Sequence, residues 1–195
     1  MILEQDLKEE LAVAKKKSAK PMLWVSMISM VMFFAGLTSA YVISMKRDDW
    51  VSFDLPLAFY ISTILIIASS FTLFFSQKFL KKDKRQLSLI FVILTLILGT
   101  GFVWQQYVGF NQLKSSGLFF TGPESTVSTS FIIGITFMHV LHILAGLVVL
   151  LVVIYNHFKY KYKSDNMLGF ELGAIFWHFV DLLWIYLFFF FYFIR

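Results

Sequence analysis

Five long runs of apolar residues, separated by short polar segments, dominate this 195-residue chain. Each run is continuous and close to the roughly 20 residues that a helix needs to cross a bilayer. Only helices and closed barrels satisfy their backbone hydrogen bonds in lipid, and a barrel strand would alternate apolar and polar side chains. The pattern therefore predicts an all-α membrane protein, a bundle of five transmembrane helices. The expected spans are residues 22–45, 57–77, 87–110, 128–155 and 171–194.

The first 20 residues differ from the rest, because they are polar and carry charges of both signs. Acidic residues this early argue against a secretory signal. Leucines recur every four residues, as in a short amphipathic helix, at Leu3, Leu7 and Leu11. We expect residues 1–20 to form a cytoplasmic segment near the headgroups, and residues 21–195 to form the membrane domain. The prolines are all expected just before helices, where a missing N–H costs little: Pro21, Pro56 and Pro123.

Composition supports a membrane protein. Hydrophobic residues make up 58% of the chain and the mean hydropathy is +0.75, whereas a soluble domain is roughly 45–50% apolar. The absence of cysteine excludes disulfides, iron–sulfur clusters and thiolate metal sites. The net charge of +5 is better explained by membrane topology than by binding of nucleic acid, so no nucleic-acid partner is expected.

Basic residues between the runs predict the orientation of the bundle. Of the 17 Lys and Arg residues, thirteen fall in residues 1–20 and in the second and fourth connections, and four fall on the opposite side. The side that is rich in Lys and Arg is normally cytoplasmic. We therefore expect a cytoplasmic N-terminus and a periplasmic C-terminus.

Ionisable side chains inside the apolar runs are the candidate functional groups, because a charge in hydrocarbon is costly and rarely idle. The fourth run contains His139 and His142, which share one helix face. The fifth contains His178 and Asp181, also on one face, with Glu171 at its start. Imidazole is a common metal ligand, so a metal or haem site is one hypothesis. However, the first three runs contain no Asp, Glu or His, and the spacing lacks the Glu-x-x-His pattern of di-iron bundles.

The preferred interpretation is a buried polar cluster that joins the fourth and fifth helices. At 1.5 Å rise per residue, His142 and Asp181 both lie about 14 Å deep. These matching depths allow a hydrogen bond from His139 or His142 to Asp181. The cluster comprises His139, His142, His178 and Asp181.

Glu171 has a different explanation, because a carboxylate in the first turn of a helix meets the positive end of the helix dipole, worth about 0.3–1 kcal/mol. A role in proton uptake, or as an anchor for a lipid or a partner, is the alternative. In the first run, Gly36 and Ala40 form a small-residue face that favours close helix packing. Gln105 and Gln106, near the end of the third run, are expected to form a hydrogen bond between helices.

Three of these segments resemble subunit III of haem-copper cytochrome oxidases. The last run fits the string G-F-E-x-G-x-x-x-W-H-F-V-D-x-x-W at Gly169, Phe170, Glu171, Gly173, Trp177, His178, Phe179, Val180, Asp181 and Trp184. The fourth fits T-x-x-H-x-x-H-x-x-x-G at Thr136, His139, His142 and Gly146. The first fits S-E-V-x-F-F-x-G-x-x-x-A-Y at Ser29, Val31, Phe33, Phe34, Gly36, Ala40 and Tyr41. Met30 departs from it, because many members carry a buried glutamate there.

The resemblance implies a non-catalytic subunit of a proton-pumping respiratory oxidase, in the short five-helix form found in bacterial inner membranes. It implies subunits I and II as partners, with the haems and copper in those subunits and no cofactor in this chain. It also implies bound phospholipid, support of proton uptake and of sustained turnover, and a larger respiratory supercomplex as a further candidate partner. The residues expected to pack helices together are Gly36, Ala40, Gly146, Trp177 and Trp184.

Three other functions stay open on the sequence. The first is subunit III of a quinol oxidase, which a partner subunit without a Cys/His copper set would indicate. The second is an accessory subunit of nitric oxide reductase, which a neighbouring catalytic subunit with non-haem iron would indicate. The third is a small ion or solute transporter built on the histidine and aspartate cluster, which would need a polar path through the first three helices.

Overall fold

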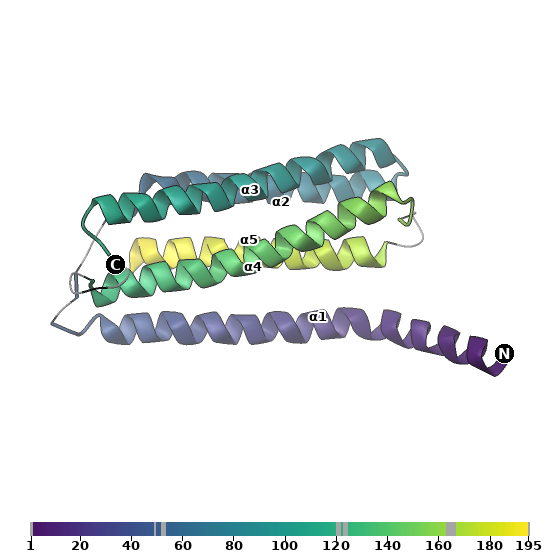
Figure 1. Cartoon of the computed structure of the whole chain (residues 1–195), viewed down its shortest axis with the longest axis horizontal. Helices are drawn as coiled ribbons and strands as arrows, with labels where there is room; N and C mark the ends of the chain where they lie inside the picture. The colour runs from purple at the N-terminus through teal and green to yellow at the C-terminus, as the bar shows by residue number, and fades with distance from the viewer. Residues whose placement is uncertain are drawn as a thin grey trace.

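A computed structural model describes residues 2–48, 50–51, 54–119, 122, 125–162 and 167–194. Within these residues the chain forms five helices, each long and apolar enough to cross a membrane (Figure 1). The predicted all-α fold with five transmembrane helices is therefore confirmed. The helices are α1 (Ile2–Ser44), α2 (Leu57–Lys81), α3 (Arg85–Ser115), α4 (Val127–Phe158) and α5 (Leu168–Phe193).

The start of α1 differs from its prediction. The helix is continuous from the N-terminal segment into the membrane span and contains Pro21, so the expectation that Pro21 precedes a helix was wrong. The Lys, Glu, Ala and Leu residues before Pro21 are strong helix formers. Proline removes one hydrogen bond, to the carbonyl of Lys17, and Lys17 lies in an exposed stretch where water can satisfy that carbonyl. Pro56 behaves as expected and lies directly before α2.

Several sequence predictions fall on positions that are not described. The side chains of Leu3 and Leu7 lie outside the described part, as do Pro123, Lys163 and Arg195. The connection between α3 and α4 contains Gly117 and Gly122, with φ of 78° and 110°. Glycine adopts these positive angles without strain, so both positions suit a turn between the two helices.

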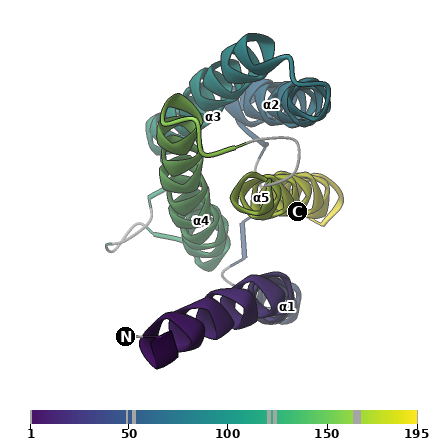
Figure 2. The ribbon, with the colours of Figure 1, turned by 90° about the vertical axis from the view of Figure 1, so that its right-hand side faces the viewer.

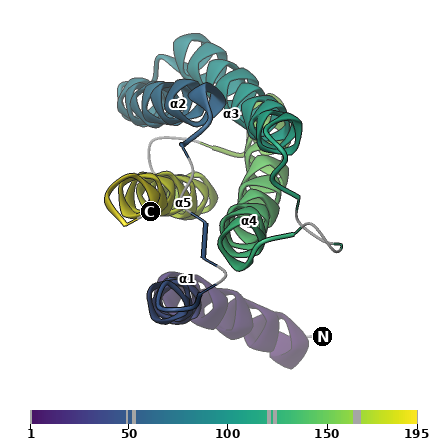
Figure 3. The same cartoon turned by 90° about the vertical axis from the view of Figure 1, so that its left-hand side faces the viewer.

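The helices form an up-and-down bundle in which α4 and α5 lie between α1 and the α2–α3 pair (Figures 2 and 3). The N-terminus, the α2–α3 turn and the α4–α5 connection lie at one end, and the C-terminus lies at the other (Figure 1). The three segments richest in Lys and Arg are thus at the same end of the bundle. Within the described residues, α1 packs against α4 and α5 but not against α2 or α3.

Polar side chains connect α2 and α3 along their length. Near one end the hydroxyls of Ser76 and Ser88 lie 3.0 Å apart, and the Thr72 and Thr95 hydroxyls are 2.8 Å apart. Farther along, the Gln106 amide donates to the Ser62 hydroxyl at 3.0 Å, which confirms the interhelical hydrogen bond expected for this glutamine. Such bonds hold helices together in lipid, where water offers no competing partner.

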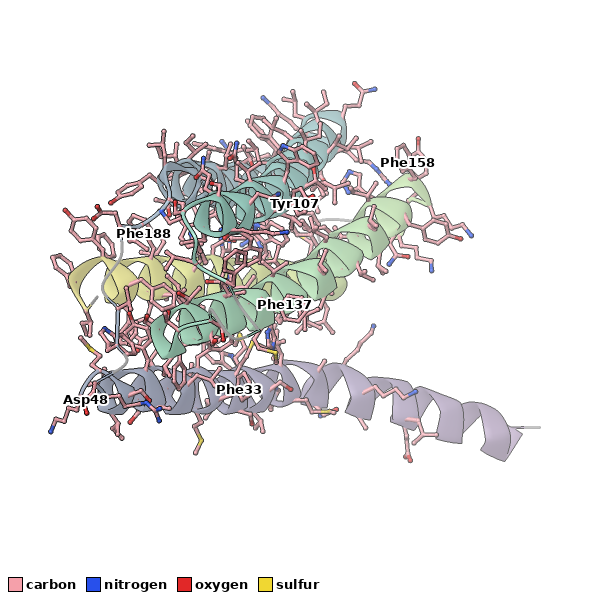
Figure 4. The ribbon with its side chains drawn as sticks, turned by 60° about the vertical axis from the view of Figure 1, so that its left-hand side comes forward. Phe33, Asp48, Tyr107, Phe137, Phe158 and Phe188 are labelled. Atoms are coloured by element: carbon pink, nitrogen blue, oxygen red, sulfur yellow. The ribbon has the colours of Figure 1, made fainter. Side chains whose placement is uncertain are left out.

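The outer surface of the bundle carries many large apolar side chains. Phe33, Tyr107, Phe137 and Phe158 are exposed on α1, α3 and α4 (Figure 4). Phe188, by contrast, is buried, and its ring lies against Tyr60 with the centroids 5.1 Å apart. A helix that is apolar all round is typical of a protein surrounded by lipid or by other membrane helices.

Candidate functional site

Trp177 of α5 lies where four helices meet. Its indole Nε1–H donates to the Ser69 hydroxyl of α2 at 3.1 Å. Its ring fills the space beside Gly99 of α3 and Gly146 of α4, where an added Cβ atom would come within 2.6 Å and 3.0 Å of indole carbons. Gly146 and Trp177 thus lie in contact, and Gly99 is a third member of this contact that the sequence did not single out.

Trp184 lies two turns farther along the same face of α5. Its indole Nε1–H donates to the Thr63 hydroxyl of α2 at 3.0 Å. Its ring contacts Phe59 and Phe102 edge-on, with centroids 5.7 and 5.1 Å away. The two tryptophans therefore join α5 to α2 by hydrogen bonds and to its other neighbours by ring contacts.

His139 of α4 lies fully buried among aromatic rings. The Trp184 ring is 5.2 Å away, and the Phe34 and Phe102 rings are 6.3 and 5.9 Å away. Neither imidazole nitrogen has a hydrogen-bond partner among the described residues. His142, one turn farther along, is half-buried, and its Nδ1–H donates to the Met138 carbonyl at 2.7 Å. Neither histidine therefore forms the hydrogen bond to Asp181 that the matching depths allow.

His178 and Asp181 face α2 instead. His178 Nδ1 lies 2.6 Å from the Ser70 hydroxyl. Asp181 is 2% exposed, and neither of its carboxyl oxygens has a partner within bonding geometry, although the Ser69 and Ser70 hydroxyls lie close to it. The four residues do not form one hydrogen-bonded cluster, because the face of α5 that meets α4 is occupied by the tryptophans.

A groove between α2 and α5 runs beside Asp181. Its volume is about 650 Å³, and its lining is apolar except for Ser70, His178 and Asp181. Phenylalanines of α2 form the opposite wall, at Phe71, Phe74 and Phe75. A second hollow of about 320 Å³, between α1 and α5, shares Leu182 with this groove. Leu182 is 65% exposed and thus stands as a ridge between the two hollows.

Glu171 lies in the first turn of α5, as predicted. Its carboxylate also accepts from the Lys20 ammonium of α1 at 2.7 Å, a contact that the sequence did not reveal.

The predicted packing face at Gly36 and Ala40 does not face another helix of this chain at Gly36. This glycine lies on an open face of α1, where an added Cβ would meet no atom within 4 Å. The contact face of α1 runs instead through Phe34, Thr38 and Tyr41. The prediction that Gly36 packs against a neighbouring helix therefore requires a helix of another chain.

The sequence did not reveal a cluster of aromatic and basic groups at the end of the bundle where Lys20 meets Glu171. The Arg85 guanidinium donates to the His157 carbonyl, and His157 Nε2–H donates to the Arg85 carbonyl at 3.1 Å. The guanidinium also lies 3.8 Å from the centre of the Tyr160 ring. Tyr162 of the same connection packs against Phe170, and its burial raises the pKa of its phenol. The only sequence signal was the position of His157 one turn before a basic connection.

The comparison with known families decides the identity of the chain. The family model for "Cytochrome c oxidase subunit III" matches residues 1–195.

The chain belongs to the cytochrome c oxidase subunit III family.

Proteins named "Cytochrome c oxidase subunit 3" are among the relatives of this subunit III family member. The one from Pelomedusa subrufa is 32% identical over 135 residues, which are 69% of this chain and 48% of the relative. Those from Pyricularia grisea and Neurospora crassa are 31% and 30% identical over 135 residues, 69% of this chain and 47% of each relative. The chain spans about half the length of the curated relatives it matches.

The family assignment confirms the resemblance that the three sequence strings indicated. Residues from these strings build much of the interior of this subunit III family member, since Phe34, Tyr41, His139, Trp177 and Trp184 are all fully buried. The histidines do not converge on one point, and no group of three or more His, Cys, Asp or Glu residues comes together in the part of the chain that is described.

Proposed function

We propose that the chain is a non-catalytic subunit III of a respiratory cytochrome c oxidase. The match of residues 1–195 to the family model carries this proposal. The apolar outer surface of the five helices supports it, because a membrane subunit of a larger complex exposes such surface to lipid and to neighbouring helices.

The proposal assigns to this chain a packing role beside subunits I and II, which would carry the haems and copper. Its own interior supports a structural role, since the Trp177 and Trp184 indoles and the glycines beside them hold α2–α5 in one arrangement. The proposal also includes phospholipid bound along the bundle, association with a larger respiratory supercomplex and support of proton uptake during sustained turnover. The location is a bacterial plasma membrane with a cytoplasmic N-terminus, an orientation that the asymmetry of Lys and Arg supports.

Purification of the native complex through a tag on this chain tests the proposal. The membranes are solubilised in a mild detergent, and the eluate is examined by reduced-minus-oxidised spectra, metal analysis and identification of subunits. We expect haem and copper together with a subunit II that has a Cys/His copper set, and oxidation of reduced cytochrome c. An untagged strain taken through the same steps controls for non-specific binding.

The alternatives give different results in the same experiment. Haem without a copper-binding subunit II, together with quinol oxidation, would mean a quinol oxidase. A partner with non-haem iron and nitric oxide reduction would mean an accessory subunit of that reductase. Purification of the chain without any haem protein would contradict the proposal and favour an independent membrane function such as transport.

A further inference from the structure

A hollow of about 610 Å³ lies between the end of α3 and the first half of α4. One end of it is polar, because the exposed side chains of Asn111 and Lys114 line it from the last turns of α3. The rest of the lining is apolar and consists of Phe110, Leu118, Phe119, Ile133 and Phe137. The hollow is thus amphipathic, and its volume is typical of a site for a small molecule.

The depths of these side chains match the layers of a bilayer. With the middle of each helix at the bilayer centre and a rise of 1.5 Å per residue, Asn111 lies about 17 Å and Lys114 about 21 Å from the centre. The hydrocarbon core ends about 15 Å from the centre, and the headgroup layer about 20–22 Å from it. Both polar side chains therefore lie among the headgroups. Phe137, exposed on the outside of α4 (Figure 4), lies about 8 Å from the centre, beside the acyl chains.

The two polar side chains are not used to hold the bundle together. Neither the Lys114 ammonium nor the Asn111 amide has a hydrogen bond or an ion pair with a described residue. Gln112, between them in sequence, points to the other side of the helix, where its side-chain oxygen accepts from the Ala58 backbone N–H of α2 at 3.3 Å. An ammonium and an amide are donors that bind phosphate oxygens. The polar end of the hollow thus offers donors to a ligand at headgroup depth.

We propose that this hollow binds one anionic phospholipid. Its phosphate accepts hydrogen bonds from Lys114 and Asn111, and one acyl chain lies between α3 and α4 against Ile133 and Phe137. The charge of Lys114 selects an anionic headgroup, because a zwitterionic headgroup carries an ammonium of its own that opposes the attraction. This inference rests on the proposed function, since it gives the bound phospholipid of that proposal a place and a headgroup class.

A photo-activatable lipid tests the site in the intact complex. The purified complex is placed in nanodiscs of phosphatidylethanolamine that contain a small fraction of phosphatidylglycerol with a diazirine midway along one acyl chain. After illumination, mass spectrometry of this chain locates the adducts. We expect them on the α4 peptide that contains Ile133 and Phe137. Phosphatidylethanolamine with the same diazirine, at the same fraction, should give a roughly fivefold lower yield there, as expected for one lysine that attracts an anionic lipid.

Substitution of Lys114 tests the contact with the headgroup. Lys114→Gln should lower the phosphatidylglycerol yield on the α4 peptide roughly fivefold. Lys46→Gln is the matched control, because Lys46 is an exposed lysine at the same end of the bundle that does not line the hollow. Lys114→Arg keeps a cation with phosphate donors and should retain most of the yield. High salt should reduce the difference between the parent and Lys114→Gln, because the site is exposed to water.

Each contrary outcome is distinct. Equal yields from Lys114→Gln and Lys46→Gln would overturn the inference, and so would equal yields from the two lipids in the parent. Adducts elsewhere on the bundle without any on this α4 peptide would mean that the hollow does not hold a lipid. Failure of haem to co-purify with the tag contradicts the proposed function, whereas co-purified haem without these adducts contradicts only this inference.

Discussion

The indole of Trp177 lies so close to Gly99 that a Cβ atom added to Gly99 would come within 2.6 Å of its Cη2 atom. The ring is held in place, because its Nε1–H is bonded to Ser69 and its other side lies against Gly146. α3 and α4 can therefore approach α5 this closely only because Gly99 and Gly146 carry no side chain.

Gly99→Ala should accordingly destabilise the bundle. We expect a loss of about 1–3 kcal/mol in the free energy of unfolding, the usual cost of overpacking, measured by unfolding in mixed detergent micelles. Gly101→Ala is the matched control on the same helix, because its Cβ would lie 3.6 Å from Leu65, an ordinary contact. Equal stability of the two variants would show that the Trp177 site is not rigid.

The hydrogen bond from Trp184 to Thr63 is open to a double-mutant cycle. Trp184→Phe and Thr63→Val each remove one partner of the 3.0 Å bond, and the double variant removes both. We expect a coupling energy of about 0.6 kcal/mol, with about 1.7 kcal/mol as an upper bound for such bonds in membranes. Additive single effects would mean that the bond contributes nothing beyond packing.

The sequence could predict the five helices because each apolar run is long and continuous. Their ends were predicted least well, and Pro21 was misplaced because a proline at the boundary of a span was taken as a helix start, while the charged residues before it already favour helix. Gln106 was predicted correctly, since a buried glutamine in lipid finds a partner wherever the neighbouring helix offers a hydroxyl.

The candidate site was only half predictable, because depth in a membrane follows from residue number but rotation of a helix does not. His142 and Asp181 have matching depths, yet Asp181 faces α2 and His142 bonds its own helix. The tryptophans determine this rotation by filling the α4 side of α5. Contacts between distant segments, such as Lys20 with Glu171, leave no spacing pattern in the sequence.

The ion pair between Lys20 and Glu171 should contribute little to stability. Its side chains are 48% and 33% exposed, so water screens the attraction across the 2.7 Å contact. We expect Lys20→Gln and Glu171→Gln each to change the free energy of unfolding by less than about 1 kcal/mol. The test is unfolding at low and high salt, where a large effect that persists in high salt would contradict this assignment.

The orientation of the bundle can be measured with single cysteines, since the parent chain has none. Lys82 follows α2, Lys161 follows α4 and Gly122 lies between α3 and α4. The α2–α3 turn and the end of α4 lie at the same end of the bundle as the N-terminus, and the α3–α4 connection lies at the opposite end (Figure 1). We expect a membrane-impermeant maleimide added to intact cells to label only Gly122→Cys. Labelling of Lys82→Cys or Lys161→Cys in intact cells would reverse the orientation that the basic residues predict.

His139 offers the sharpest test of whether a buried polar residue in this chain has a structural role or a further partner. Both of its imidazole nitrogens are buried without a bond among the described residues, and an unsatisfied buried group costs about 1–3 kcal/mol. A leucine of similar size removes that cost, so His139→Leu should leave the free energy of unfolding unchanged or raise it by up to that amount.

His178→Leu is the matched control, because it removes the 2.6 Å contact with Ser70 and should destabilise the chain by about 1 kcal/mol. The two variants are thus expected to change the free energy of unfolding in opposite directions, although both replace a histidine of the membrane interior by leucine. In the purified complex, His139→Leu should also keep a normal initial rate. If His139→Leu instead unfolds more readily than His178→Leu, or loses activity while fully assembled, the imidazole of His139 does something that leucine cannot replace, and its place among Phe34, Phe102 and Trp184 is not explained by packing alone.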